Sequence, residues 1–284
     1  MAVPPLSPLV IAVVLGAALL HAIWNAIAHG VRDRLVGFAL MGVVDVVVGG
    51  ALVAVAAPLT ATAWPYVVAS AAAHVAYNLL LLGSYQLGEF SQMYPLARGT
   101  SPWVVALVSL LVLHRALQPA QLVGVLVVSA GLAGLVLVGG RIGRLQLPAL
   151  AAAFATGLTI ALYTVIDGLG VATTPLTAYI GWLFLLQGPA MPLLALARRG
   201  RALPAQMRRY AAPGVVGGLV AIAAYGAVLW AQTSGALAPI AALRETSIVF
   251  GALIGALFLG EHLGRRRAVM AGVVLVGVLV LSLG

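Results

Sequence analysis

An arginine lies inside each of two apolar segments of the sequence, and the same two hydroxyl residues follow both of them. The stretch ARGTS at 97–101 and the stretch LRETS at 243–247 place Arg98 and Arg244 146 residues apart, with Thr and Ser at the same spacing behind each. A charge within a membrane-spanning segment is costly, so it usually faces protein or water and is a candidate for function. The structural alternative is that each guanidinium reaches the membrane surface or binds carbonyls at helix ends. We expect Arg98 and Arg244 to form two related polar positions around a central cavity.

Other titratable residues lie within the apolar segments. Glu245 directly follows Arg244 but points about 100° away around a helix, so the two share a face only if the helix is broken. Asp45 lies near the middle of an apolar run, where it must be protonated or paired; a structural hydrogen bond and a role in proton coupling both stay open. His21 and His74 can carry a proton during transport or serve the structure alone. No spacing of these residues predicts a metal site.

Aromatic and amide residues accompany these charges. A cavity with aromatic walls and a few amides suits a substrate with an apolar body and polar ends. Besides His21, Arg98, Arg244 and Glu245, the residues expected to line the cavity are Trp24, Asn25, Tyr77, Asn78, Tyr94, Tyr163 and Tyr225.

The composition requires a membrane around these residues. The 284-residue chain is 63% hydrophobic and 7% charged, with a mean hydropathy of +1.14, so too few polar residues remain to cover a soluble surface. About ten apolar runs have the roughly 20 residues that a helix needs to cross the bilayer. The sequence therefore predicts an all-α integral membrane protein with ten transmembrane helices. These lie near 8–28, 35–57, 64–87, 91–113, 119–139, 147–167, 175–196, 211–233, 237–259 and 266–283.

The basic residues are distributed unevenly over the connections between these runs. The net charge is +9, and all fifteen basic residues are arginines. Twelve lie in odd-numbered connections and only Arg115 lies in an even-numbered one, which is the positive-inside signal. This pattern argues against nucleic-acid binding and predicts odd connections in the cytoplasm, with both termini outside. The chain has no cysteine, which excludes disulfides and thiolate metal sites.

The chain divides into two similar halves, residues 1–143 and 144–284. The offset that aligns Arg98 with Arg244 is accompanied by matches in other runs, including Tyr77 with Tyr225 and Trp24 with Tyr163. Each half holds five runs, an odd number, so the second half enters the membrane from the opposite side. Such inverted five-helix repeats are typical of secondary transporters that work by alternating access.

Two stretches of sequence carry a family resemblance. The segment YPLARGTSP at 94–102 and the segment GALFLGEHLGRRRAVMAGVVLVGVLVL at 255–281 resemble the EamA family of the drug/metabolite transporter superfamily, and within it the YddG-like exporters of aromatic amino acids. The first half has His114–Arg115 where the second has Gly260–Glu261. The resemblance implies a multi-pass protein of the inner (cytoplasmic) membrane with a central cavity, small-molecule substrates and no cofactor. It also implies cytoplasmic termini, in contrast to the arginine distribution.

The leading hypothesis is an exporter of amino acids, aromatic ones included, and related small metabolites. The alternative within transport is an exporter of lipophilic drugs or other metabolites. An intramembrane enzyme is disfavoured because no His, Asp or Glu spacing supplies a reacting set, and a scaffold would not need paired polar residues in the membrane. The sequence leaves open proton coupling against facilitated diffusion, and it is compatible with a monomer.

Overall fold

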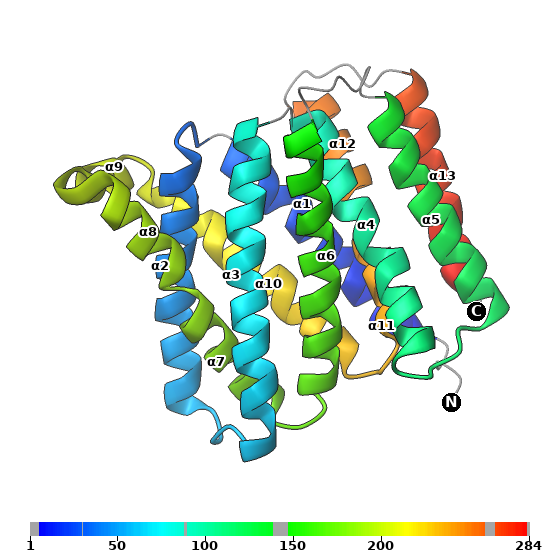
Figure 1. The fold of residues 1–284 in the computed structure, drawn as a ribbon, viewed down its shortest axis with the longest axis horizontal. Helices are drawn as coiled ribbons and strands as arrows, with labels where there is room; N and C mark the ends of the chain where they lie inside the picture. The colour runs from blue at the N-terminus through cyan, green and yellow to red at the C-terminus, as the bar shows by residue number, and fades with distance from the viewer. Residues whose placement is uncertain (1–5, 30, 88–89, 139–146, 259–264, 283–284) are drawn as a thin grey trace.

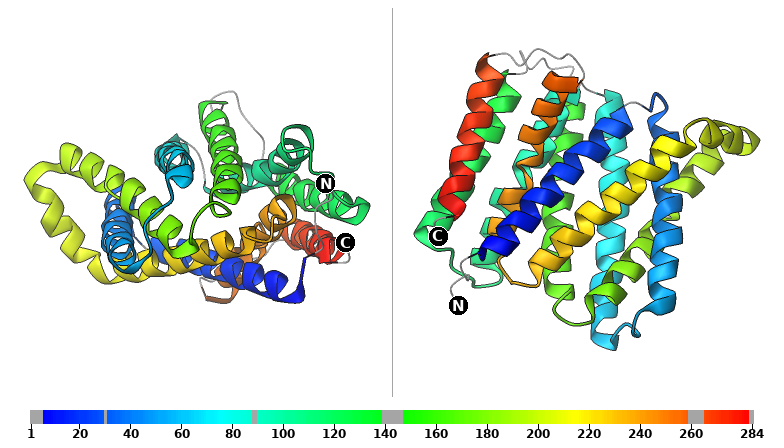
Figure 2. Two further views of the ribbon diagram at one scale, coloured as in Figure 1. Left: turned by 90° about the horizontal axis from the view of Figure 1, so that it is seen from below. Right: turned by 180° about the vertical axis from the view of Figure 1, so that it is seen from behind.

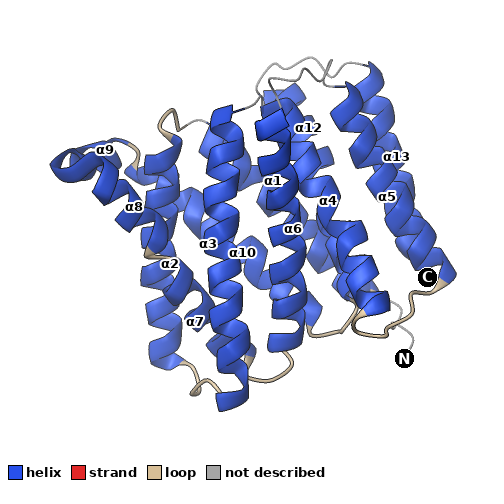
Figure 3. Cartoon of the chain, viewed as in Figure 1, coloured by secondary structure: helices blue, strands red, loops and turns tan. Residues whose placement is uncertain are grey.

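The computed structural model describes residues 6–29, 31–87, 90–138, 147–258 and 265–282, and within these ranges all regular structure is helical (Figure 3). In the first half, each long apolar run forms one helix. These helices are α1 (Pro8–His29), α2 (Arg34–Val55), α3 (Trp64–Leu87), α4 (Phe90–Leu111) and α5 (Pro119–Val138), with a 3₁₀ turn, η1 (Ala61–Ala63), before α3. Local chemistry sets the helix ends: the Asp33 carboxylate caps α2 by accepting from Val36 N at 3.3 Å.

The second half is divided into more pieces. Its helices are α6 (Leu147–Gly170), α7 (Leu176–Gln187), α8 (Ala190–Arg199), α9 (Leu203–Arg209), α10 (Ala211–Gln232), α11 (Leu237–Arg244), α12 (Ser247–Phe258) and α13 (Arg265–Ser282), with a 3₁₀ turn, η3 (Gly200–Ala202), before α9. The boundaries of most helices lie within a few residues of the predicted runs, because those runs end at charges, prolines and glycines.

Two of the predicted runs are interrupted within their length. The run at 175–196 is divided into α7 and α8, where Pro189 and Pro192 supply no backbone N–H to the helix. The run at 237–259 is divided into α11 and α12 at Glu245–Thr246. There Glu245 N donates to Ala242 O at 3.1 Å and Thr246 N donates to Leu243 O at 3.1 Å, so the chain makes tight turns in place of the α-helical pattern.

The helices of the two halves pack mainly against each other. Helix α5 packs along α13, α2 along α7 and α8, and α6 along α3 and α4, while α1 packs along α10 and also touches α11 and α12. The view from behind shows α1 and α10 side by side (Figure 2). Small residues permit these approaches: a Cβ at Gly157 of α6 would lie 2.6 Å from Ala97 O of α4.

The two ends of this helical layer differ in what they carry. We call one end the terminal face: α1 begins there, α13 ends there, and residues 56–63 and 171–175 connect helices there (Figure 1). The other end, where α1 ends, α2 begins and α8 and α9 lie, is the arginine face, with residues 31–34 and 198–209. The odd-numbered connections that the structure describes therefore share one end, as the arginine distribution requires.

The chain is a multi-pass membrane protein. Among the described residues, six helical segments are long and apolar enough to cross a membrane, and the apolar segments Pro119–Gly134 and Ala268–Leu281 are shorter. Ten spans thus remain a prediction. Many large apolar side chains lie exposed, which suits a surface that faces lipid; Val55, Leu111 and Leu279 are more than 60% exposed.

Candidate functional site

Two arginines and one glutamate form a buried ionic cluster at the break between α11 and α12. Arg98 Nε of α4 lies 2.7 Å from Glu245 Oε2, and Arg244 Nε lies 3.6 Å from Glu245 Oε1. All three side chains are at most 3% exposed. Arg98 Nη2 also donates to Ser247 Oγ at 3.2 Å. The 2.7 Å contact is an ion pair by distance, although its Nε–H direction does not meet hydrogen-bond geometry.

The break explains how neighbouring residues come to share one site. In a continuous helix Glu245 would point about 100° away from Arg244. The tight turns at 245–246 remove this constraint and place the carboxylate between the two guanidinium groups. Arg98 and Arg244, predicted from their spacing, thus lie in one cluster rather than at two separate positions.

The cluster holds more positive than negative charge. Two guanidiniums share one carboxylate, and Arg244 Nη2 has no hydrogen-bond partner among the residues that the structure describes. The Arg244 guanidinium carbon lies 5.8 Å from the centre of the Tyr163 ring, which supplies a cation–π contact. A buried guanidinium with an unused donor can receive a carboxylate.

Aromatic rings lie next to the ionic cluster, where the Arg244 guanidinium faces the Tyr163 ring. His74 of α3 stacks on Tyr163 of α6 with ring centres 3.9 Å apart, and Tyr225 of α10 meets the Tyr163 ring edge-on at 5.8 Å. Tyr77 also meets Tyr163 edge-on at 5.8 Å. We call His74, Tyr77, Tyr163 and Tyr225 the aromatic group. Three helices from two halves supply it, and it offers ring faces and hydroxyls next to the guanidiniums.

Asp167 is a buried carboxylate that the sequence analysis missed. Its side chain is fully buried at the end of α6 and accepts hydrogen bonds from Tyr179 of α7, at 2.7 Å, and from Tyr225. The signal was present, because Asp167 ends a predicted span and an acid within a span needs a partner.

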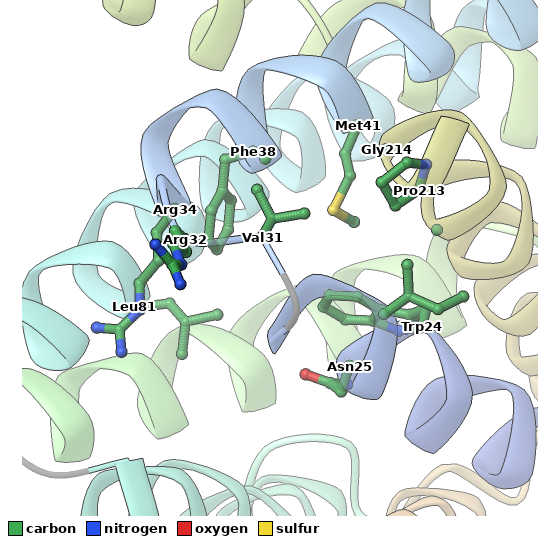
Figure 4. A pocket seen from close by; sticks show the side chains of 13 residues that line it. Trp24, Asn25, Val31, Arg32, Arg34, Phe38, Met41, Leu81, Pro213 and Gly214 are labelled. Atoms are coloured by element: carbon green, nitrogen blue, oxygen red, sulfur yellow. The ribbon is translucent and has the colours of Figure 1, made fainter. Parts of the chain in front are cut away.

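A cavity opens at the arginine face, and none of the ionic-cluster residues is in its lining. It measures about 180 Å³ and lies between α1, α2, α3 and α10 (Figure 4). Trp24 and Asn25, both predicted to line a cavity, form part of its wall, and Arg32 and Arg34 lie in its lining. The complete lining is Trp24, Asn25, Ile27, Val31, Arg32, Arg34, Gly37, Phe38, Met41, Leu81, Pro213, Gly214 and Gly217.

His21 lies beside the wall of this cavity. Trp24 Nε1 donates to His21 Nδ1 at 3.1 Å, and Asn25 Nδ2 donates to the His21 carbonyl at 2.7 Å. The histidine is therefore bonded to two residues of the cavity wall.

The other predicted residues lie apart from this site or outside the description. Asp45 of α2 accepts from Gln187 Nε2 of α7 at 3.3 Å, which is the structural hydrogen bond weighed from the sequence. Asn78 lies half-buried on α3. The side chain of Tyr94 lies outside the described residues. Within the described ranges, no three His, Asp or Glu side chains gather in a way that could hold a metal ion.

The family comparison matches the second half of the chain. Residues 147–283 match the EamA-like transporter family. The EamA match covers the helices that supply Arg244, Glu245, Asp167, Tyr163 and Tyr225, and it suggests a membrane transporter of small metabolites. The family's members are transporters and not enzymes.

The whole chain has a counterpart among solved structures. A chain titled "Crystal structure of protein" is 20% identical and superposes with a TM-score of 0.77, covering 96% of this chain and 98% of that one. At this identity the likeness concerns the fold alone. No curated protein matches the sequence.

Proposed function

We propose that the protein exports amino acids, aromatic ones included, and related small metabolites across the inner (cytoplasmic) membrane. It works by alternating access between two inverted five-helix halves, 1–143 and 144–284, without a cofactor. The observation that carries the proposal is the ionic cluster at the broken helix α11–α12, beside the aromatic group. Broken helices with buried charges at the contact between repeats are typical binding sites of secondary transporters.

Glycine contacts between α5 and α13 support the inverted arrangement. A Cβ at Gly131 would lie 3.1 Å from Val274 N, and a Cβ at Gly277 would lie 2.7 Å from Val128 N. The two glycines are 146 residues apart, and so are the two valines. Each half therefore presents the same glycine to the same position of the other half.

The pair α2 and α7 repeats this reciprocity with a different offset. A Cβ at Gly49 would lie 2.8 Å from Gly181 O, and one at Gly188 would lie 2.8 Å from Gly42 O. Gly49 and Gly188 are 139 residues apart, as are Gly42 and Gly181, and the same offset relates Trp24 to Tyr163. Matching contacts of this kind follow from a two-fold axis between the halves.

The chemistry of the site favours amino acids. A guanidinium with an unused donor suits the substrate carboxylate, and the aromatic group suits an apolar or aromatic side chain. The alternative, an exporter of lipophilic drugs, uses the rings but not the unused guanidinium donor. Competition for uptake between tryptophan and an aromatic cation separates the two, because only the first carries a carboxylate.

The test is uptake of labelled tryptophan, phenylalanine and threonine into proteoliposomes, with and without a pH gradient. We expect uptake above that of empty liposomes and a reduction of about ten-fold or more in Arg244→Gln, since it loses a charge-assisted hydrogen bond. The control is Arg201→Gln, an exposed arginine outside the site. If no amino acid moves under any gradient, the amino-acid proposal fails. A response to the gradient that Asp45→Asn abolishes would assign proton coupling to Asp45; facilitated diffusion predicts no response.

A further inference from the structure

A packed apolar cluster, which we call the plug, lies at the terminal face. The plug joins α3, α6–α7 and α10, and its buried members are Val67, Ala71, Val171, Tyr179, Leu183 and Leu229. Partly buried residues, among them Tyr66 and Ile180, pack against it. Each of these helices begins or ends at the terminal face, and on the helices that they share the plug residues lie nearer to those ends than the aromatic group does. The plug therefore lies between the aromatic group and that face.

Asp167 is the polar centre of this plug. It lies three residues before the end of α6, about 5 Å along the axis from the helix end. Tyr179, a plug member, donates to one carboxylate oxygen, and Tyr225, a member of the aromatic group, donates to the other. The carboxylate therefore connects α7 and α10 to α6, and it joins the plug to the rings beside the ionic cluster.

The connections outside the plug are also joined. Thr60 Oγ1 donates to Thr173 O at 2.9 Å, and Thr60 N donates to Thr174 Oγ1 at 3.3 Å. These bonds link the α2–α3 connection of the first half to the α6–α7 connection of the second. The terminal face is thus closed by hydrogen bonds at two depths.

The corresponding region of the first half is built differently. With the offset of 139 residues, Asp167 corresponds to Ala28 and Tyr179 to Leu40, so neither the acid nor its phenol donor is present. Ile180 of the plug corresponds to Met41, which lines the open cavity at the arginine face. Leu40 is itself buried in an apolar cluster at the arginine face, so what distinguishes the terminal face is the buried acid and its phenol donor.

We propose that Asp167, with Tyr179 and Tyr225, forms a latch that holds the terminal face closed, and that Asp167 is a positioning residue of the transport cycle. The inference rests on the proposed function, because it assigns one gate of an alternating-access transporter. All three residues lie in the second half, so the latch holds α6, α7 and α10 together beside the plug. In this proposal, opening the terminal face moves α7 and α10 away from α6 and breaks both phenol bonds. Each bond that must break costs free energy, so the latch favours the state in which only the arginine face is open.

The absence of native cysteine permits a test that needs no substrate. Ala73, 5% exposed and packed on Tyr163 in the interior, is replaced by cysteine, and the rate of reaction with a membrane-impermeant maleimide is measured in right-side-out and in inside-out vesicles. A second single-cysteine chain, Thr62→Cys in the exposed turn η1, identifies the vesicles in which the terminal face is outside.

We expect Asp167→Asn and the double variant Tyr179→Phe/Tyr225→Phe each to raise labelling of the Ala73→Cys chain from the terminal face by about ten-fold or more, because each weakens both bonds to the carboxylate. Labelling from the arginine face should stay the same or fall. The matched control is Tyr66→Phe, since Tyr66 packs on the plug but is not a donor to Asp167.

Two outcomes would overturn the latch. Unchanged labelling from the terminal face would show that the plug closes this end without Asp167. Increased labelling from both faces would assign Asp167 to general packing. Neither outcome depends on which molecule is transported, so a failure of the latch and a failure of amino-acid export are separate results.

Discussion

The arginine face and the terminal face differ in how the described side chains fill them. At the arginine face, α1, α2, α3 and α10 enclose a cavity with Trp24 and Asn25 in its wall. At the terminal face, residues of α3, α7, α10 and the α6–α7 connection pack into the plug beside Asp167. The backbone differs as well, because α2 is one helix whereas the run at 175–196 is divided into α7 and α8. Under the proposed inverted arrangement, a difference between the two faces is what alternating access requires.

The largest expected effect concerns the ionic cluster that lies between the two faces. Glu245→Gln removes the carboxylate that two buried guanidiniums share, and breaking a buried pair in this way typically costs about 3–5 kcal/mol. We expect a severe loss of thermal stability in detergent, or failure to accumulate in the membrane. The control is Glu245→Asp, which keeps the charge and should retain part of the stability; equal stability of wild type and Glu245→Gln would contradict the assignment.

The next effect tests the contact that both halves share. In Gly277→Val the new Cβ would lie 2.7 Å from Val128 N, so α5 and α13 must move apart, at a cost of about 1–3 kcal/mol. The measurement is the melting temperature of the purified protein. At Gly272, on the same helix, a new Cβ meets no atom within 4 Å, and Gly272→Val should leave the melting temperature nearly unchanged. Similar losses in both variants would argue against close packing at Gly277.

A larger side chain placed in the cavity tests the contrast between the two faces. Gly217 lines it, and a Cβ there would make an ordinary contact at 3.5 Å with Ile27. We expect Gly217→Leu to lower the transport rate by about ten-fold while the protein stays folded, because the leucine occupies space that a substrate needs. Gly16→Leu, at an exposed position of α1 with no neighbour within 4 Å, should transport normally. Normal transport by both variants would remove the cavity from the pathway.

The smallest effect concerns the ion pair at the arginine face. Arg199 Nη2 lies 2.7 Å from Asp33 Oδ2, with side chains 40% and 27% exposed. Such pairs contribute about 0–1 kcal/mol because water screens them and ordering long side chains costs entropy. Arg199→Ala should shift the melting temperature far less than Glu245→Gln. A loss as large as that of Glu245→Gln would show that this pair closes part of the arginine face.

The sequence predicted most helix boundaries, because apolar runs end where charges, prolines and glycines begin. It could not predict the break at Glu245–Thr246, because buried residues continue on both sides of it. The break is favourable only in the folded protein, where it brings Glu245 to Arg98. The repeat pointed to Arg98 and Arg244, but their common counter-charge depends on that break. Asp167 was within reach of the same argument that selected Asp45.

The position of the cavity was also beyond the sequence. Trp24 and Asn25 belong to α1, which is apolar along its whole length. Nothing in the spacing of these residues says at which end of the protein a cavity opens. In the structure Met41 lines the cavity, whereas Ile180 packs against the plug. Packing of this kind is a property of the state as well as of the residues.

The pairing of Arg98 with Glu245 also has a consequence for biosynthesis. The two residues are separated by 147 positions, so Arg98 enters the membrane long before its partner leaves the ribosome. At about 5–20 residues per second, translation supplies Glu245 roughly 7–30 s later. During that interval the nascent chain holds a guanidinium in the bilayer without its carboxylate, and a message truncated before codon 245 would leave it so permanently.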